Sequence, residues 1–207
     1  PIIAYNGGLI INKDKIIQST EISNLVLESI INKCKTTSIH ISLYHADEWF
    51  VPAIDLWANR EISNTKVVPE IKSNKEVLKS WELEGIGAHK IMCMGNESEI
   101  DTLYTSLEKE FSNEIILYRS KSTYIEISHR SISKKTAIEV LLKSNYPNLT
   151  MDNVVAFGDN YNDIEMLKAV GLGVAVANAN EEVLNVADKV TDTNKNDGVA
   201  KVLKNLF

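Results

Sequence analysis

The residues best suited to chemistry lie in VVAFGDNYNDIEML, which runs from Val154 to Leu167. An apolar run ending before Gly158 predicts a strand, and apolar residues at helical spacing resume after Asp163. Ligands of an open α/β sheet bind beyond the carboxyl ends of its strands, so Asp159 is expected at that edge. Hard carboxylate and amide oxygens suit Mg²⁺, which completes its octahedron with water and phosphate. The turn therefore predicts a Mg²⁺ ligand at Asp159, whereas Asp163 alone could equally be a helix N-cap.

A second candidate lies in SISKKTAIEVLL, Ser131 to Leu142, where Ser133 is a good N-cap. This places Lys134 and Lys135 in the first helical turn, where positive charge opposes the helix dipole by about 0.3–1 kcal/mol each. A solvated helix surface tolerates such lysines. Beside a carboxylate and phosphate site, however, a lysine could stabilise the charge on a transferring phosphoryl group. One of the two lysines is thus a candidate for this role.

The elements that must position these residues fall into two parts. From residue 129 onward, predicted strands and helices alternate, which is typical of parallel strands joined by helical crossovers. Residues 19–128 mix hairpins and helices and are typical of an α+β fold. Ile2 to Tyr5 is predicted to be a short buried strand, and Asn6-Gly7-Gly8 a turn. The middle part is therefore expected to be inserted into an α/β core.

Composition excludes several classes of function. The formal net charge of −6 disfavours binding to nucleic acid or an anionic membrane surface. No apolar run approaches the roughly 18 residues that span a bilayer. Cys34 and Cys93 do not form a disulfide framework and are expected to be reduced core thiols. The expected location is the cytoplasm, and the oligomeric state is unknown from the sequence.

Taken together, four segments resemble the Cof-type (HAD-IIB) branch of the haloacid dehalogenase-like hydrolases. IIAYNGGLII resembles the strand and Asn-Gly turn before the family's inserted cap domain, and RSKSTYIEISHRSISKKTAIEVL resembles its last cap strand and the helix start that follows. VAFGDNYNDIEML resembles the metal-binding motif, and GLGVAVANANEEVLNVADKVT with NKNDGVAKVL resembles the tail behind it. The match covers nearly the whole chain in the family's order.

The resemblance implies a Rossmann-like α/β core formed by residues 1–18 and 129–207, with residues 19–128 as an α+β cap that selects the substrate. It implies that Lys134 is the catalytic lysine that neutralises the phosphate and the nucleophile. Asp159 and Asp163 correspond to the acids of the Mg²⁺ site. Asn162 corresponds to an amide near the phosphate, and Asn6 belongs to the Asn-Gly turn and is a candidate substrate-binding residue. The implied activity is Mg²⁺-dependent hydrolysis of small phosphorylated metabolites such as sugar phosphates.

The group that attacks phosphorus is the missing part of this pattern. The family uses an aspartate of a DxD motif and forms an aspartyl-phosphate. No two aspartates of this sequence are separated by a single residue, and no strand precedes Ile2 to carry the motif. We therefore expect an incomplete core and an inactive chain, either as part of a longer phosphatase or as a non-catalytic binding module. A weaker alternative is attack by another carboxylate, Asp14 or Asp47.

Overall fold

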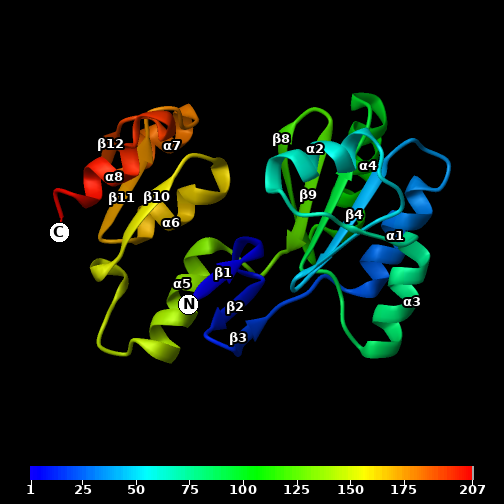
Figure 1. Ribbon diagram of the computed structural model, residues 1–207, viewed down its shortest axis with the longest axis horizontal. Coiled ribbons are helices and arrows are strands. Elements are labelled where there is room, and N and C mark those ends of the chain that lie inside the picture. The colour runs from blue at the N-terminus through cyan, green and yellow to red at the C-terminus, as the bar shows by residue number, and fades with distance from the viewer. Residues whose placement is uncertain (207) are drawn as a thin grey trace. The chain divides into compact units, whose positions relative to one another are not determined.

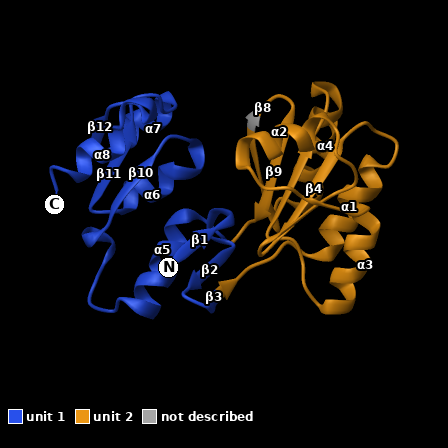
Figure 2. Ribbon diagram, in the orientation of Figure 1, with its two compact units in different colours: residues 1–17, 132–207 blue, residues 18–131 orange. Residues whose placement is uncertain are grey.

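The computed structural model describes residues 1–206, except for the side chain at position 120. The chain forms two units, residues 1–17 with 132–207 and residues 18–131 (Figures 1 and 2). Each unit has a hydrophobic core of its own, and Ile30, Leu43 and Ile127 belong to the larger core, in the second unit. The units divide at 17/18 and 131/132, close to the boundaries expected at 18/19 and 128/129.

The N-terminal strands of the first unit form a small antiparallel sheet in the order β1-β2-β3. Its strands are β1 (Ile2–Ala4), β2 (Leu9–Asn12) and β3 (Lys15–Ser19), with a 3₁₀ turn at Tyr5–Gly7. The expectation that Ile2 starts a buried strand is wrong, because 63% of this residue is exposed. The reason is that β1 is an edge strand of a separate sheet and is not buried between layers of the α/β core.

The rest of the first unit is an α/β layer with a parallel sheet in the order β10-β11-β12. The strands are β10 (Val155–Gly158), β11 (Leu172–Val176) and β12 (Lys189–Thr191). The helices are α5 (Lys134–Asn145), α6 (Ile164–Ala169), α7 (Glu181–Val186) and α8 (Gly198–Leu203), and short 3₁₀ turns lie at Met151–Asn153, Tyr161–Asp163 and Asn194–Asn196. Apolar side chains of α6 and α7 pack on β10 and β11, with Leu167 and Val183 fully buried. The alternation predicted from residue 129 onward is thus confirmed.

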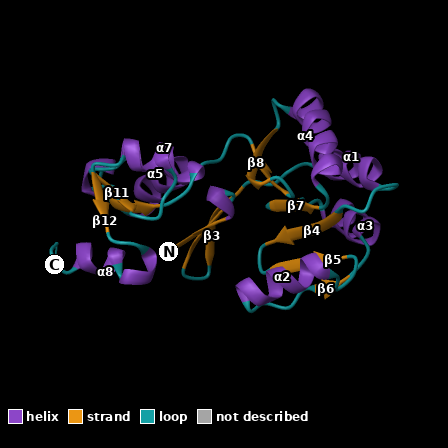
Figure 3. Ribbon diagram, turned by 90° about the horizontal axis from the view of Figure 1, so that it is seen from above, coloured by secondary structure: helices purple, strands orange, loops and turns teal. Residues whose placement is uncertain are grey.

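The second unit contains a six-stranded sheet in the order β6-β5-β4-β7-β9-β8. Its strands are β4 (His40–His45), β5 (Glu48–Val51), β6 (Glu70–Ile71), β7 (Lys90–Met94), β8 (Ile115–Lys121) and β9 (Tyr124–His129). Helices α1 (Asn24–Cys34), α3 (Asn74–Glu84) and α4 (Glu97–Phe111) cover one face, and α2 (Leu56–Thr65) lies on the other (Figure 3). Because successive strand residues alternate between faces, Ile91 and Cys93 of β7 reach the three-helix core. Met92 and Met94 belong instead to a smaller cluster with Tyr124.

The structure also bears on the predictions that the chain has no membrane span and that its cysteines are reduced and buried. In residues 1–206, no helix is long and apolar enough to cross a bilayer. Cys34 and Cys93 are free and buried, as expected.

Candidate functional site

The turn after β10 presents the candidate metal ligand. Asp159 directly follows Gly158, the last residue of β10, at the carboxyl end of the parallel sheet. Its side chain is exposed. A Cβ at Gly158 would lie 2.5 Å from Asp163 Cβ, so a larger residue would push the two ends of the turn apart. Glycine is therefore required sterically at the step between strand and turn.

Asp163 ties this turn together from inside. It is 2% exposed, and its Oδ2 accepts hydrogen bonds from the amides of Asp159 at 3.0 Å and Asn160 at 3.1 Å. Its Oδ1 accepts a hydrogen bond from Lys134 Nζ at 2.5 Å. Both oxygens are thus engaged, Oδ2 by two backbone amides and Oδ1 by Lys134.

The start of α5 directs Lys134 to the turn. Ser133 caps the helix by accepting a hydrogen bond from the amide of Thr136, which fixes Lys134 as the first helical residue. The side chain of Lys134 is one-third exposed and forms the ion pair with Asp163. Lys135 instead pairs with Glu139 at 2.9 Å, and the pKa of Lys135 is raised because this carboxylate accepts its hydrogen bond. The residues alone left the two lysines equivalent and the family resemblance selected Lys134; in the structure it is Lys134 that pairs with Asp163.

Asn6 and Asn162 meet across 156 residues of chain. Asn162 Nδ2 donates a hydrogen bond to Asn6 Oδ1 at 3.0 Å. Gly7 has φ of +108°, and a Cβ there would lie 2.6 Å from the carbonyl oxygen of Ser133, so the Asn-Gly turn packs closely against the start of α5. Asn162 Oδ1 is buried and has no hydrogen-bond partner among the described residues. It is therefore an acceptor that a ligand could satisfy.

Sequence reasoning missed Asn180. This residue lies in the loop after β11 and forms hydrogen bonds to the turn after β10. Asn180 Nδ2 donates a hydrogen bond to Asn160 Oδ1 at 3.0 Å, and the backbone amide of Asn180 donates to the carbonyl oxygen of Asp159 at 3.1 Å. Asn160 Oδ1 also accepts the amide of Tyr161 at 2.8 Å. The signal available in the sequence was the amide-rich ANAN segment just after the β11 strand. Because parallel strands end at the same sheet edge, this segment had to lie beside Asp159.

The donor set fits a hard cation. In the part of the chain that the structure describes, no ion pair or hydrogen bond engages the Asp159 carboxylate, and the orphan Asn162 oxygen belongs to the same turn. Mg²⁺ is commonly held by only one or two carboxylates, with water and phosphate oxygens filling the remaining positions. Lys134, at the start of α5, brings a positive charge to this turn through its ion pair with Asp163. A carboxylate, a lysine and amides at one sheet edge define a class of α/β proteins suited to phosphoryl chemistry.

Comparison with known proteins agrees with this class. Residues 1–203 match the family model of the haloacid dehalogenase-like hydrolases. A predicted phosphatase of Haemophilus influenzae is 32% identical over 100% of this chain and 76% of its own length. A 5-amino-6-(5-phospho-D-ribitylamino)uracil phosphatase of Bacillus subtilis is 37% identical over 58% of this chain and 49% of its own length. The crystal structure of a haloacid dehalogenase-like hydrolase from Bacteroides thetaiotaomicron superposes with a TM-score of 0.85 at 28% identity, over 98% of this chain and 75% of that one.

The chain belongs to the haloacid dehalogenase-like hydrolase family. Its relatives and structural neighbours include phosphatases, and its fold is the mixed α/β fold of that family. The resemblance stated from the sequence is thereby confirmed.

Proposed function

We propose that this chain carries the metal and lysine half of a Mg²⁺-dependent phosphatase acting on small phosphorylated metabolites. The observation that carries the proposal is the set of contacts around Asp163. This one buried carboxylate fixes Lys134 and the backbone of Asp159 and thereby brings a cation and a free carboxylate to one turn. Such an arrangement is useful where negative charge builds up on phosphoryl oxygens.

Each residue has a distinct role in the proposal. Asp159 is the direct Mg²⁺ ligand, and Asp163, the second acid of the metal site, also holds the turn and orients Lys134. Lys134 neutralises the phosphate and the attacking carboxylate. Asn162 and Asn6 position the phosphate as a hydrogen-bonded pair. A bound Mg²⁺ would supply charge neutralisation on the phosphoryl group.

The attacking group is proposed to be an aspartate of the family's DxD motif. In that reaction the carboxylate oxygen bonds to phosphorus as the alcohol leaves, and water then hydrolyses the aspartyl-phosphate. No DxD occurs among the 207 residues of this sequence. By analogy with nucleophile removal in serine proteases, a chain lacking it would lose on the order of 10⁴–10⁶ in rate.

Substrate selection is proposed for the second unit. The Bacillus relative is named for a substrate that carries a phosphorylated sugar alcohol, and a structural neighbour with the same fold at 18% identity is described as a sugar phosphatase. Small phosphorylated sugars and sugar alcohols are therefore the first substrates to test. The reduced state of Cys34 and Cys93 suits the proposed cytoplasmic location.

The alternative is a non-catalytic binding module that keeps the metal site. Such a module would bind Mg²⁺ and phosphate at Asp159 and Lys134 without turnover. Attack by Asp14 or Asp47 is a third reading that no contact in the described residues supports.

The deciding experiment compares this chain with Asp159→Asn in two assays. Isothermal titration with Mg²⁺ and inorganic phosphate is expected to show binding that is lost in the variant, and absence of binding in both would refute the site. Hydrolysis of p-nitrophenyl phosphate is expected to be no faster than in the variant. Mg²⁺-dependent turnover that disappears in Asp159→Asn would instead show that another carboxylate of this chain attacks.

A further inference from the structure

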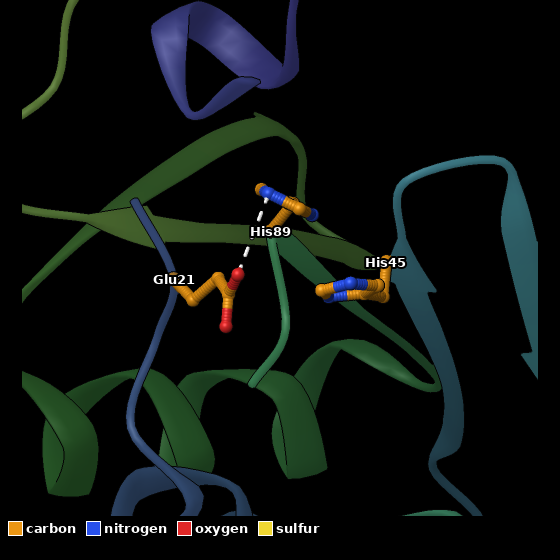
Figure 4. A group of neighbouring side chains, drawn as sticks. All are labelled: Glu21, His45 and His89. Carbon is orange, nitrogen blue, oxygen red and sulfur yellow. Dashed lines mark ion pairs between the residues drawn. The ribbon is translucent and has the colours of Figure 1, made fainter. Parts of the chain in front are cut away.

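A cluster of three potential metal ligands lies in the second unit, far in sequence from the site described above. Glu21, His45 and His89 each offer one ligand atom, and these atoms lie within 4.8 Å of one another. Glu21 comes from the segment before α1, His45 from the end of β4, and His89 from the residue before β7. Figure 4 shows the three side chains converging on a shared space from these separate segments.

A single residue, Gly87, orients two of the three side chains. Its carbonyl oxygen accepts a hydrogen bond from His45 Nδ1 at 2.7 Å, which leaves Nε2 of that ring with its lone pair. Its amide donates to Glu21 Oε2 at 2.6 Å, which directs Oε1 of the same carboxylate toward His89 Nε2, 3.9 Å away. Ligating histidines of metal sites typically donate their second ring N–H to a backbone carbonyl or a carboxylate. His45 already shows this arrangement.

His89 is the most buried member of the cluster, at 1% exposure. Its Nε2 lies 2.9 Å from Ser19 Oγ, and its Nδ1 accepts the amide of Ala46 at 3.1 Å. Because its Nδ1 accepts the Ala46 amide, this nitrogen carries a lone pair and the ring is neutral, as a ligand must be. Ligation through Nε2 would replace its contact with Ser19, move the ring proton to Nδ1 and break the Ala46 hydrogen bond. Two neutral hydrogen bonds are a small loss beside a metal–nitrogen bond.

We propose that Glu21, His45 and His89 bind a divalent cation of the Zn²⁺ type, with water as the fourth ligand. Two imidazoles and one carboxylate form a typical Zn²⁺ ligand set, whereas Mg²⁺ prefers oxygen ligands throughout. The site is independent of the Mg²⁺ site proposed at Asp159. Because Glu21 lies three residues after Gln18, where the chain enters the second unit, the bound ion would fasten this entering segment to the β4 and β7 ends of the sheet.

The test is a calorimetric titration of the metal-free chain with Zn²⁺ in the presence of a large excess of Mg²⁺. We expect one Zn²⁺ per chain and a higher melting temperature of the second unit, read from the fluorescence of its tryptophans. His45→Gln and Glu21→Gln should each weaken binding by roughly 100-fold or more, because each removes a ligand. Asp159→Asn and His129→Gln, which change an acid and a histidine outside the cluster, should bind Zn²⁺ as the unmodified chain does.

Two results would overturn the proposal. One is no Zn²⁺ binding in the presence of Mg²⁺, and the other is equal affinity in Glu21→Gln and the unmodified chain. Glu21 is only partly buried, so its variant decides the question if His45→Gln does not fold. The melting curve of each metal-free variant, compared with that of the unmodified chain, separates a loss of folding from a loss of binding.

Discussion

Replacing Asp163 tests how the turn after β10 is held. The buried carboxylate accepts hydrogen bonds from two backbone amides and from Lys134 Nζ. Hydrogen bonds to charged groups contribute about 1.5–3 kcal/mol each, but Lys134 is one-third exposed, so solvent offsets much of the ion pair. Asp163→Asn retains an oxygen for the amides and loses mainly the charged pair, for an expected cost of about 1 kcal/mol. Asp163→Ala leaves both amides without their acceptor, and we expect a cost of about 3 kcal/mol.

The distribution of tryptophan makes this measurement selective. Trp49, Trp57 and Trp81 all lie in the second unit, so their fluorescence reports its unfolding alone, whereas far-UV circular dichroism reports both units. For a domain of 60–100 residues, 1 kcal/mol shifts the melting temperature by about 4–8 °C. The dichroism transition of the first unit should therefore fall by roughly 12–24 °C in Asp163→Ala and by roughly 4–8 °C in Asp163→Asn, with the fluorescence transition unchanged. The reasoning is refuted if Ala destabilises no more than Asn, or if the fluorescence transition alone moves.

Three further variants probe other contacts. Gly7→Ala places a Cβ 2.6 Å from the Ser133 carbonyl oxygen at a φ of +108°, so the first unit should lose about 2 kcal/mol or more by dichroism; an unshifted transition would contradict the close packing. His89 has its pKa lowered from 6.5 to about 4 by burial, so the unfolded state binds more protons between these values. With a chelator present, the stability of the second unit should therefore be complete above pH 6.5 and fall toward pH 4. In His89→Gln, the free energy of unfolding from fluorescence-monitored urea titrations should depend less on pH. The same pH dependence in the variant as in the unmodified chain would contradict the role given to His89. Asp55→Ala removes the N-cap of α2 and the hydrogen-bond partner of buried His40, 2.8 Å from its Nδ1. The second unit should therefore lose about 2 kcal/mol of stability by fluorescence, while the dichroism transition of the first unit is unchanged.

Local patterns in the sequence were sufficient for most of the elements near the site. The apolar run before Gly158, the N-cap at Ser133 and the alternation after residue 129 correspond to β10, the start of α5 and the parallel layer. These features depend on neighbouring residues, because strand and helix periodicities and caps are set within a few positions. The same locality explains why Asp159 could be placed at the carboxyl edge of a strand from the sequence alone.

The tertiary structure decided which of these residues meet. Asn6 and Asn162 are 156 positions apart, and only the packing of the Asn-Gly turn on α5 brings them to hydrogen-bond distance. The ion pair of Lys134 with Asp163, and of Lys135 with Glu139, depends on the direction in which α5 presents its first turn. The N-terminal strands have an apolar pattern that fits a buried layer, but they pair with each other in an antiparallel sheet.

The cluster of Glu21, His45 and His89 is a second case in which the sequence did not indicate that residues meet. In the sequence His89 starts a strand and Glu21 lies in a connecting segment, and neither has a spacing typical of metal ligands. The sheet register and the two hydrogen bonds of Gly87 bring the three side chains together. The sequence by itself thus determined the element types, the family and the residue types of the candidate site. Long-range strand pairing and helix packing decided which side chains converge, because those contacts join segments whose local patterns are independent of one another.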